Sequence, residues 1–157
     1  MYSRTNHRTD AYGGSIPNRA RFALEVVAAI SAAIGPERTA IRLSPFGTYQ
    51  DMREADPVPT FTYLIQELKK QNPDLAFLHV VESVDKEKES VDWAREAWKG
   101  DGKGIFLSAL GHDRESGLRY AEEKGDVIVY GQKFISNVSI IFLGGLPVNI
   151  LPSIIIA

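Results

Sequence analysis

The amino-acid sequence predicts an α/β fold in which helices cover a parallel β-sheet, and three observations lead to this prediction. Short, almost continuous apolar runs alternate along the chain with amphipathic segments whose apolar residues recur at helical spacing. The runs lack the apolar–polar alternation of strands that face water on one side, so both of their faces are expected to be covered. No linker divides the 157 residues, a length that suits a single domain able to bury a core.

The first expected helix has clear start and stop signals. Ser15 is a candidate N-cap, Pro17 falls in the first turn, and Gly35 with the proline after it ends the helix. Inside it the apolar residues that recur at helical spacing are Phe22, Val26, Ile30 and Ala33. A short strand is then expected over residues 39–43, where the turn-forming sequence SPFG ends it.

Three more helices and three more strands are expected to follow in alternation. The strands cover residues 75–81, 105–109 and 126–130, and the helices cover about residues 59–70, 91–99 and 113–124. One face of the helix over 59–70 collects Phe61, Leu64, Ile65 and Leu68. Asp113 is a candidate cap for the last helix, and Gly125 is its expected stop.

Two arrangements of these strands remain open at this point. One is an open, doubly wound sheet of the flavodoxin-like kind, and the other is part of a (β/α)₈ barrel. A complete barrel has eight strands in about 250 residues, so four strands amount to about half of one. Periodicity does not choose between the two arrangements, whereas the spatial order of the strands does.

Composition and charge exclude several classes of function. A net charge of −2 and a pI of about 5.9 leave no broad basic field for nucleic acid. The absence of cysteine excludes a disulfide scaffold, a cysteine nucleophile and a thiolate metal site, and it fits a reducing, cytoplasmic compartment. The three histidines lack metal-ligand spacing, so no metal is expected. We expect His79 to be a satisfied core histidine and His7 and His112 to lie at the surface.

Residues 138–157 form a divergent apolar tail. The tail is almost uncharged from Ile140 onward and rich in isoleucine, but two prolines and a Gly-Gly pair interrupt it. It is therefore too broken for a transmembrane helix, and no membrane partner is expected. The polar start of the chain has no apolar core of a secretory signal, so no cleaved signal is expected either.

The most specific feature of the sequence is the stretch RTDAYGGSIPNRARF at residues 8–22. It resembles the old yellow enzyme family of FMN-dependent ene-reductases. The blocks IRLSPFG (41–47), LHVVE (78–82), YG (130–131) and FISN (134–137) follow in the order and spacing of that family. The resemblance covers about residues 3–137, looks closest to fungal members and fades in the tail.

The resemblance implies a partial (β/α)₈ barrel, of which this chain supplies about the last four βα units. The family binds FMN at the C-terminal mouth of the barrel, uses NAD(P)H as reductant and reduces small-molecule activated alkenes. By resemblance the chain begins in the loop after the fourth strand of the family. The acid tyrosine and the pair of side chains that clamps the substrate are then expected upstream of Met1, so no catalytic residue is assigned.

This expectation leaves two hypotheses for the chain. The first is an FMN-dependent NAD(P)H oxidoreductase that is inactive as this fragment alone. The second is a non-catalytic half-barrel that pairs with another chain or with itself, or that is the product of a truncated gene. A four-stranded parallel sheet has two unpaired edges and an open inner face, which favours association.

The resemblance also assigns residues to the flavin site. Arg42 matches the arginine at the N1/O2 edge of the flavin, where a fixed guanidinium stabilises the negative charge of the reduced ring. Without the resemblance, the favoured interpretation of Arg42 is an arginine at a strand end that pairs with a helix carboxylate. The turn of Ala109, Leu110 and Gly111 matches a turn whose backbone amides face the phosphate, and Leu110 stands where a glycine is usual.

The segment after the last strand departs further from the family pattern. Gly131 and Gln132 occupy the place of a Gly-Arg pair whose arginine grips the phosphate, and Gln132 brings no charge. Lys133 is a candidate substitute, although its position is expected to point elsewhere and lysine lacks the guanidinium fork. Tyr49 and Gln50 match a loop that approaches the substrate in the family, with Gln50 in place of a more usual asparagine.

Overall fold

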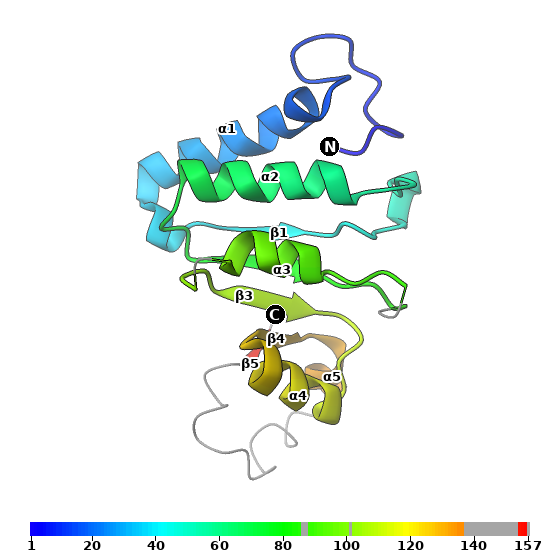
Figure 1. Ribbon diagram of the computed structural model, residues 1–157, viewed down its shortest axis with the longest axis vertical. Coiled ribbons are helices and arrows are strands. Elements are labelled where there is room, and N and C mark those ends of the chain that lie inside the picture. Colours follow the sequence, from blue (N-terminus) through cyan, green and yellow to red (C-terminus); the bar gives the residue numbers. More distant parts are fainter. Residues whose placement is uncertain (86–87, 101, 137–153, 157) are drawn as a thin grey trace.

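Helices and strands alternate in the computed structural model, which describes residues 1–85, 88–100, 102–136 and 154–156 (Figure 1). The strands are β1 (Ala40–Leu43), β2 (Phe77–Val81), β3 (Phe106–Ala109), β4 (Val127–Tyr130) and β5 (Ile154–Ile156). The α-helices are α1 (Ile16–Ile34), α2 (Val58–Gln71), α3 (Asp92–Lys99), α4 (Arg114–Lys124) and α5 (Gln132–Ser136). Two 3₁₀ helices, η1 (Pro36–Arg38) and η2 (Tyr49–Asp51), flank β1. All helices and strands with predicted ranges are present, with ends that differ by at most two residues.

The strands form one parallel sheet in the order β1-β2-β3-β4-β5. Each strand therefore lies beside the strand that follows it in the sequence. A doubly wound sheet reverses its strand order at a switch point, whereas a (β/α)₈ barrel keeps its strands in sequence order. The order excludes the flavodoxin-like arrangement and makes the sheet an arc of a barrel.

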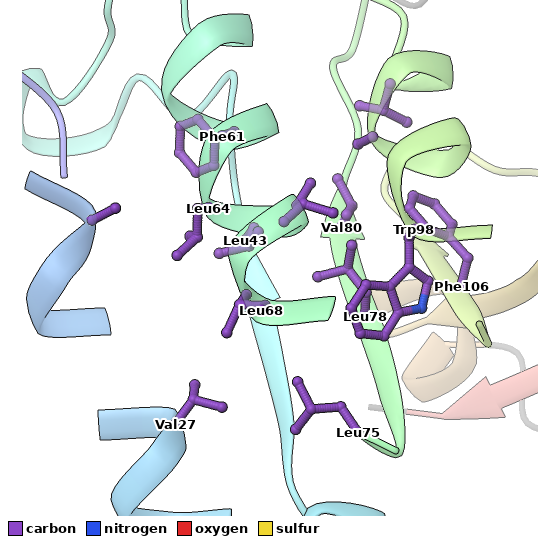
Figure 2. Close-up of a cluster of buried hydrophobic side chains, with 14 of the residues drawn as sticks. Val27, Leu43, Phe61, Leu64, Leu68, Leu75, Leu78, Val80, Trp98 and Phe106 are labelled. Carbon is purple, nitrogen blue, oxygen red and sulfur yellow. The ribbon is translucent and has the colours of Figure 1, made fainter. Parts of the chain in front are cut away.

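Helices α1, α2 and α3 pack side by side and form a layer against one face of the sheet (Figure 1). The main hydrophobic core lies between this layer and the strands, and Figure 2 shows Leu64 and Leu68 of α2 near Leu43 of β1. The predicted apolar face of α2 is confirmed, because all four of its residues are buried: Phe61, Leu64, Ile65 and Leu68. Full burial of one such side chain stabilises the fold by about 1.5–3 kcal/mol.

The opposite face of the sheet, here called the inner face, has a smaller apolar cluster. Successive side chains of a strand point to opposite faces, so Leu78 joins the main core while His79 lies on the inner face. Leu107 and Ala109 of β3 and Val129 of β4 form the inner cluster. This face corresponds to the interior of a closed barrel.

Helix α1 buries only a narrow side against α2. Its buried residues are Ala20, Val27 and Ser31. Four large apolar residues, here called the α1 stripe, point away from the core and are 66%, 38%, 43% and 50% exposed: Phe22, Val26, Ile30 and Ile34. The helical spacing of the first three was predicted correctly, but it marks an exposed surface instead of the core-facing side of α1.

The predicted helix ends are confirmed at both ends of α4. The side chain of Asp113 accepts a hydrogen bond from the backbone nitrogen of Ser116 at 2.8 Å, and the Ser116 hydroxyl accepts one from the Asp113 nitrogen in return. Gly125 ends the helix in the left-handed conformation, with φ of 61°. The N-terminal cap fixes where α4 begins and therefore where the turn after β3 ends.

Most of the apolar tail lies outside the described residues, together with the predictions made for it. Its described part is β5, which pairs in parallel with β4 and which the sequence did not predict. Within the described residues, no helix is long and apolar enough to cross a membrane.

Candidate functional site

A pocket of about 270 Å³ opens on the inner face at the carboxyl ends of the strands. All seven residues predicted to hold the cofactor line this one pocket: Arg42, Ala109, Leu110, Gly111, Gly131, Gln132 and Lys133. They come from β1, from the turn after β3 and from the segment after β4, so the parallel sheet brings three distant segments of the chain together. Ligands of barrel enzymes bind at this end of the strands.

Arg42 is the charged residue of β1, and its side chain is exposed on the inner face. It makes no hydrogen bond or ion pair with any residue that the structure describes, so the alternative reading of a strand-end pair with a helix carboxylate is wrong. Within the part of the chain that the structure describes, no aspartate or glutamate lines the pocket. The guanidinium is therefore available to an anionic ligand.

His79 of β2 lies directly beside Arg42, because the two residues are register partners. Burial and, to a smaller extent, the positive charge of Arg42 together lower the pKa of His79 from 6.5 to about 4. The imidazole is consequently neutral at pH 7. Its Nε2 atom is buried and has no hydrogen-bond partner among the described residues. His79 is thus buried as predicted, but it is not satisfied, and it lines the pocket.

The turn after β3 has a conformation that favours glycine at two successive positions. Leu110 has φ of 81° and Gly111 has φ of 71°. A residue with a Cβ atom is strained in this region by roughly 1–2 kcal/mol, so Leu110 stores strain at the edge of the pocket. Its side chain is 46% exposed and lines the pocket. Leu110 is therefore the residue that fits a backbone phosphate site least well.

Lys133 supplies positive charge at the other side of the same turn. Its Nζ atom donates a hydrogen bond to the backbone carbonyl of His112 at 2.8 Å. This contact directs the side chain toward the β3 turn and into the pocket lining, although its sequence position was expected to point elsewhere. Gln132 is exposed and also lines the pocket.

A buried polar network behind the pocket holds the β3 turn in place. The Ser108 hydroxyl donates a hydrogen bond to Glu82 and lies 2.7 Å from Nε2 of His112. Glu82 also lies 3.4 Å from a guanidinium nitrogen of Arg95, which in turn forms an ion pair with Asp126 at 2.7 Å. The expected surface position of His112 is wrong, because this network and the adjacent ring of Tyr120 bury it to 3% exposure.

Burial raises the pKa of the Asp126 carboxyl, while its hydrogen bond to Arg95 and the charges of Arg95 and Lys99 act in the opposite direction. Removing Arg95 would leave Asp126 and Glu82 without their shared cation, which makes Arg95 a structural residue of high consequence. Among the described residues, no cluster of histidines and carboxylates has the arrangement of a metal site.

A second hollow, of about 560 Å³, adjoins the pocket and shares Val81 and Leu110 with it. The loops after β1 and β2 line it, including Phe46 and Thr48. Tyr49 and Gln50 follow Thr48 directly but are exposed and line neither hollow. The structure therefore places these two predicted substrate residues outside the lining of the cofactor pocket and outside that of the second hollow.

The chain matches a protein-family model over residues 1–142, and that model describes the NADH:flavin oxidoreductase / NADH oxidase family. The chain belongs to this family. The family binds FMN and uses a nicotinamide nucleotide, and one similar structure is that of morphinone reductase in complex with tetrahydroNAD.

Two plant relatives show how much of a family member is present. 12-oxophytodienoate reductase 1 of Oryza sativa subsp. japonica is 37% identical over 141 residues, which cover 87% of this chain and 37% of the rice protein. 12-oxophytodienoate reductase 2 of Arabidopsis thaliana is 37% identical over 145 residues, with the same two shares. The chain thus spans less than half the length of the curated relatives that it matches.

Solved structures of relatives confirm the barrel arc. Morphinone reductase superposes with a TM-score of 0.73 and 36% identity over 86% of this chain and 36% of its own. An old yellow enzyme homologue from Zymomonas mobilis superposes with a TM-score of 0.78 and 29% identity. The match covers 94% of this chain and 42% of the homologue. The predicted closeness to fungal members stays a prediction, since the two curated relatives named here come from plants.

Proposed function

We propose that this chain is the FMN-binding C-terminal half of an NAD(P)H-dependent oxidoreductase of the ene-reductase type. Its substrates are small-molecule activated alkenes, reduced when the remaining strands of the barrel are supplied, and its compartment is the cytoplasm. The observation that carries this proposal is Arg42, whose guanidinium has no partner among the described residues and faces a pocket that none of the described carboxylates lines. Membership of a flavin oxidoreductase family supports the choice of an anionic flavin as the ligand.

Each polar group of the pocket has a distinct task in this proposal. Arg42 binds the pyrimidine edge of the isoalloxazine ring, where a guanidinium stabilises negative charge. Lys133 and the backbone amides of the β3 turn bind the phosphate, and Lys133 replaces the missing arginine charge. The apolar residues Ala109 and Val129 exclude water from the base of the pocket. Bound FMN would supply hydride transfer between the nicotinamide and the alkene.

We assign no proton donor for the alkene within these 157 residues, so the chain alone is proposed to bind the cofactor without turnover. Tyr49 and Gln50 follow Thr48, which lines the second hollow, and in this proposal they contact a substrate and not the cofactor. Reduction of an enone by the purified chain with FMN and NADPH, above the rate of free FMN, would overturn the assignment of inactivity.

The binding proposal is tested by mixing the purified chain with excess FMN, desalting it and recording flavin absorption with the elution volume. The same measurement is made on Arg42→Leu and on a control, Arg38→Leu. Arg38 precedes β1 at its other end and its side chain is 76% exposed. We expect the wild type and the control to retain flavin, and Arg42→Leu to bind it at least tenfold more weakly, because a charge-assisted hydrogen bond is lost.

Equal retention by wild type and Arg42→Leu would contradict the role of Arg42. A wild-type protein that elutes at a defined size without flavin would contradict the binding function itself. Circular dichroism of the three proteins separates a failure to bind from a failure to fold.

A second candidate function is a non-catalytic half-barrel that pairs with a complementary half-barrel, and the α1 stripe favours it. The stripe lies on the helix that precedes β1, and β1 pairs with β2 alone among the described strands. Sedimentation of the chain over a range of concentrations tests the form of this proposal in which the partner is a second copy of the chain, with Ile30→Lys as the variant. Association that Ile30→Lys abolishes supports pairing through the stripe, whereas a monomer at all concentrations contradicts self-association.

A further inference from the structure

We propose that His79 is a further ligand-contacting residue of this pocket, and that its Nε2 atom hydrogen-bonds to a hydroxyl of the ribityl chain of FMN. The inference rests on the proposed function, because it specifies which part of the flavin one additional side chain recognises.

His79 lies between the two ends of the pocket, so we expect it to contact the middle of the ligand, between the flavin ring and the phosphate. Arg42 lies on β1, whereas the turns proposed for the phosphate follow β3 and β4. His79 lies on the intervening strand, β2, as the register partner of Arg42 on one side and of Leu107 on the other. A flavin that extends from the guanidinium to the turns therefore crosses β2 with the chain that links its ring to its phosphate.

The chemistry of Nε2 matches a hydroxyl group. The atom belongs to a residue that is 7% exposed, lines the pocket and has no partner for Nε2 among the described residues. A buried polar atom without a hydrogen bond costs about 1–3 kcal/mol, so a ligand group that satisfies it gains affinity. Burial, helped by the neighbouring charge of Arg42, keeps the imidazole neutral by lowering its pKa, and a hydroxyl can either donate to or accept from a neutral ring nitrogen. Phosphate oxygens would satisfy only one of the two tautomers.

The stability of the flavin-free protein distinguishes a histidine that serves the fold from one that serves the ligand. If His79 served the fold, replacing it with a ring of similar shape that lacks nitrogen would destabilise the protein. If its polar atom serves the ligand, His79→Phe removes an unsatisfied group and leaves the stability of the flavin-free protein unchanged or higher. Stability and flavin affinity then change in opposite directions.

The experiment measures FMN affinity by quenching of flavin fluorescence and the melting temperature of the flavin-free protein. The variants are His79→Phe, His79→Leu and His79→Gln, and the control is His7→Gln at an exposed position. A second ligand, an FMN analogue whose linker is a phosphorylated pentyl chain without hydroxyls, completes a double-mutant cycle.

We expect His79→Phe and His79→Leu to bind FMN about tenfold more weakly, which is the loss of one buried hydrogen bond, with no change in affinity for the analogue. His79→Gln, whose amide reaches about as far as Nε2, should recover most of this loss, and His7→Gln should match the wild type.

Equal losses for FMN and for the analogue, or no loss for either, would overturn the hydroxyl contact while leaving flavin binding intact. A lower melting temperature in both apolar variants, with unchanged FMN affinity, would assign His79 to the fold. Absence of flavin binding by the wild-type protein would overturn the proposed function and this inference together.

Discussion

The two faces of the sheet differ in how completely their side chains are satisfied. On the face covered by helices, Leu64, Leu68 and Leu78 have no exposed surface and pack in one continuous core. On the inner face, a small apolar cluster lies beside Arg42, which has no partner among the described residues, and beside His79, whose Nε2 has none. The covered face therefore supplies the stability. The inner face holds one buried polar atom, Nε2 of His79, which reduces stability until something binds it, and one exposed guanidinium, that of Arg42.

The largest expected effect is a loss of stability on substitution in the core of the covered face. Leu68→Ala should lower the free energy of unfolding by about 3 kcal/mol, because the substitution leaves a cavity in a closed core. Ile30→Ala in the α1 stripe should lower it by at most about 0.5 kcal/mol. Urea unfolding at low protein concentration measures both values.

A cost for Ile30→Ala that approaches the cost for Leu68→Ala would show that the α1 stripe is covered in solution. If that cost also rose with protein concentration, the covering surface would be a second copy of the chain.

The α1 stripe also shows what a sequence pattern leaves open. The spacing in both α1 and α2 predicts an apolar face, and the structure has one in each helix. Whether such a face is buried depends on the neighbouring helix, and α1 has such a neighbour, α2, on one side only among the described residues. Local patterns thus predicted the helices, the strands and the parallel sheet, but not which surfaces they bury.

The site residues also differ in how well the sequence predicted them, depending on whether their contacts are local or come from distant segments. The seven residues predicted to hold the cofactor were assigned by resemblance to the family, and the sheet brings all of them to one pocket. The burial of His112 was missed because its partners, Ser108 and Glu82, come from two neighbouring strands. The place of His79 in the pocket lining was not predicted, because it depends on the register between β1 and β2 that sets His79 beside Arg42. One signal was present, since Arg42 and His79 are polar residues that interrupt the apolar strands β1 and β2.

The next effect, on pH dependence, belongs to the inner face. In the folded protein the pKa of His79 is about 4, against 6.5 for an ordinary histidine, so between these values the unfolded chain binds a proton that the folded chain does not. Stability should therefore fall as the pH decreases from 6.5 to 4, by at most about 3 kcal/mol. His79→Phe should lack this loss, so the difference between the two proteins should grow toward acid pH.

Thermal unfolding of the wild type and of His79→Phe at several pH values between 4 and 7.5 measures this difference. Because the carboxylates are common to both proteins, their titration cancels in the comparison. Parallel curves for the two proteins would show that His79 keeps an ordinary pKa.

A smaller effect is expected at the phosphate end of the pocket, where charge is reduced. Gln132→Arg adds a guanidinium next to Gly131 and should tighten FMN binding by about 1.5 kcal/mol, roughly tenfold. Affinity for riboflavin, which lacks the phosphate, should stay the same. The matched control is Gln66→Arg on the exposed side of α2. An equal gain for FMN and riboflavin would contradict the assignment of this end to the phosphate.

The smallest effect concerns the strained turn, and two substitutions at Leu110 separate strain from bulk. Leu110→Ala removes most of the side chain but keeps a Cβ atom at φ of 81°, whereas Leu110→Gly removes both. Glycine is ordinarily less stable than alanine by about 0.5–1 kcal/mol, because it loses more conformational freedom on folding. Here relief of roughly 1–2 kcal/mol of left-handed strain should outweigh that loss, so Leu110→Gly should be the more stable variant by up to about 1 kcal/mol.

Both variants should bind FMN more tightly than the wild type, because each uncovers the pocket edge that the leucine side chain occupies. A higher melting temperature for Leu110→Ala than for Leu110→Gly would show that the turn relaxes to a negative φ when the leucine is removed. In that case the left-handed conformation would belong to this side chain and not to a phosphate-binding turn built into the backbone.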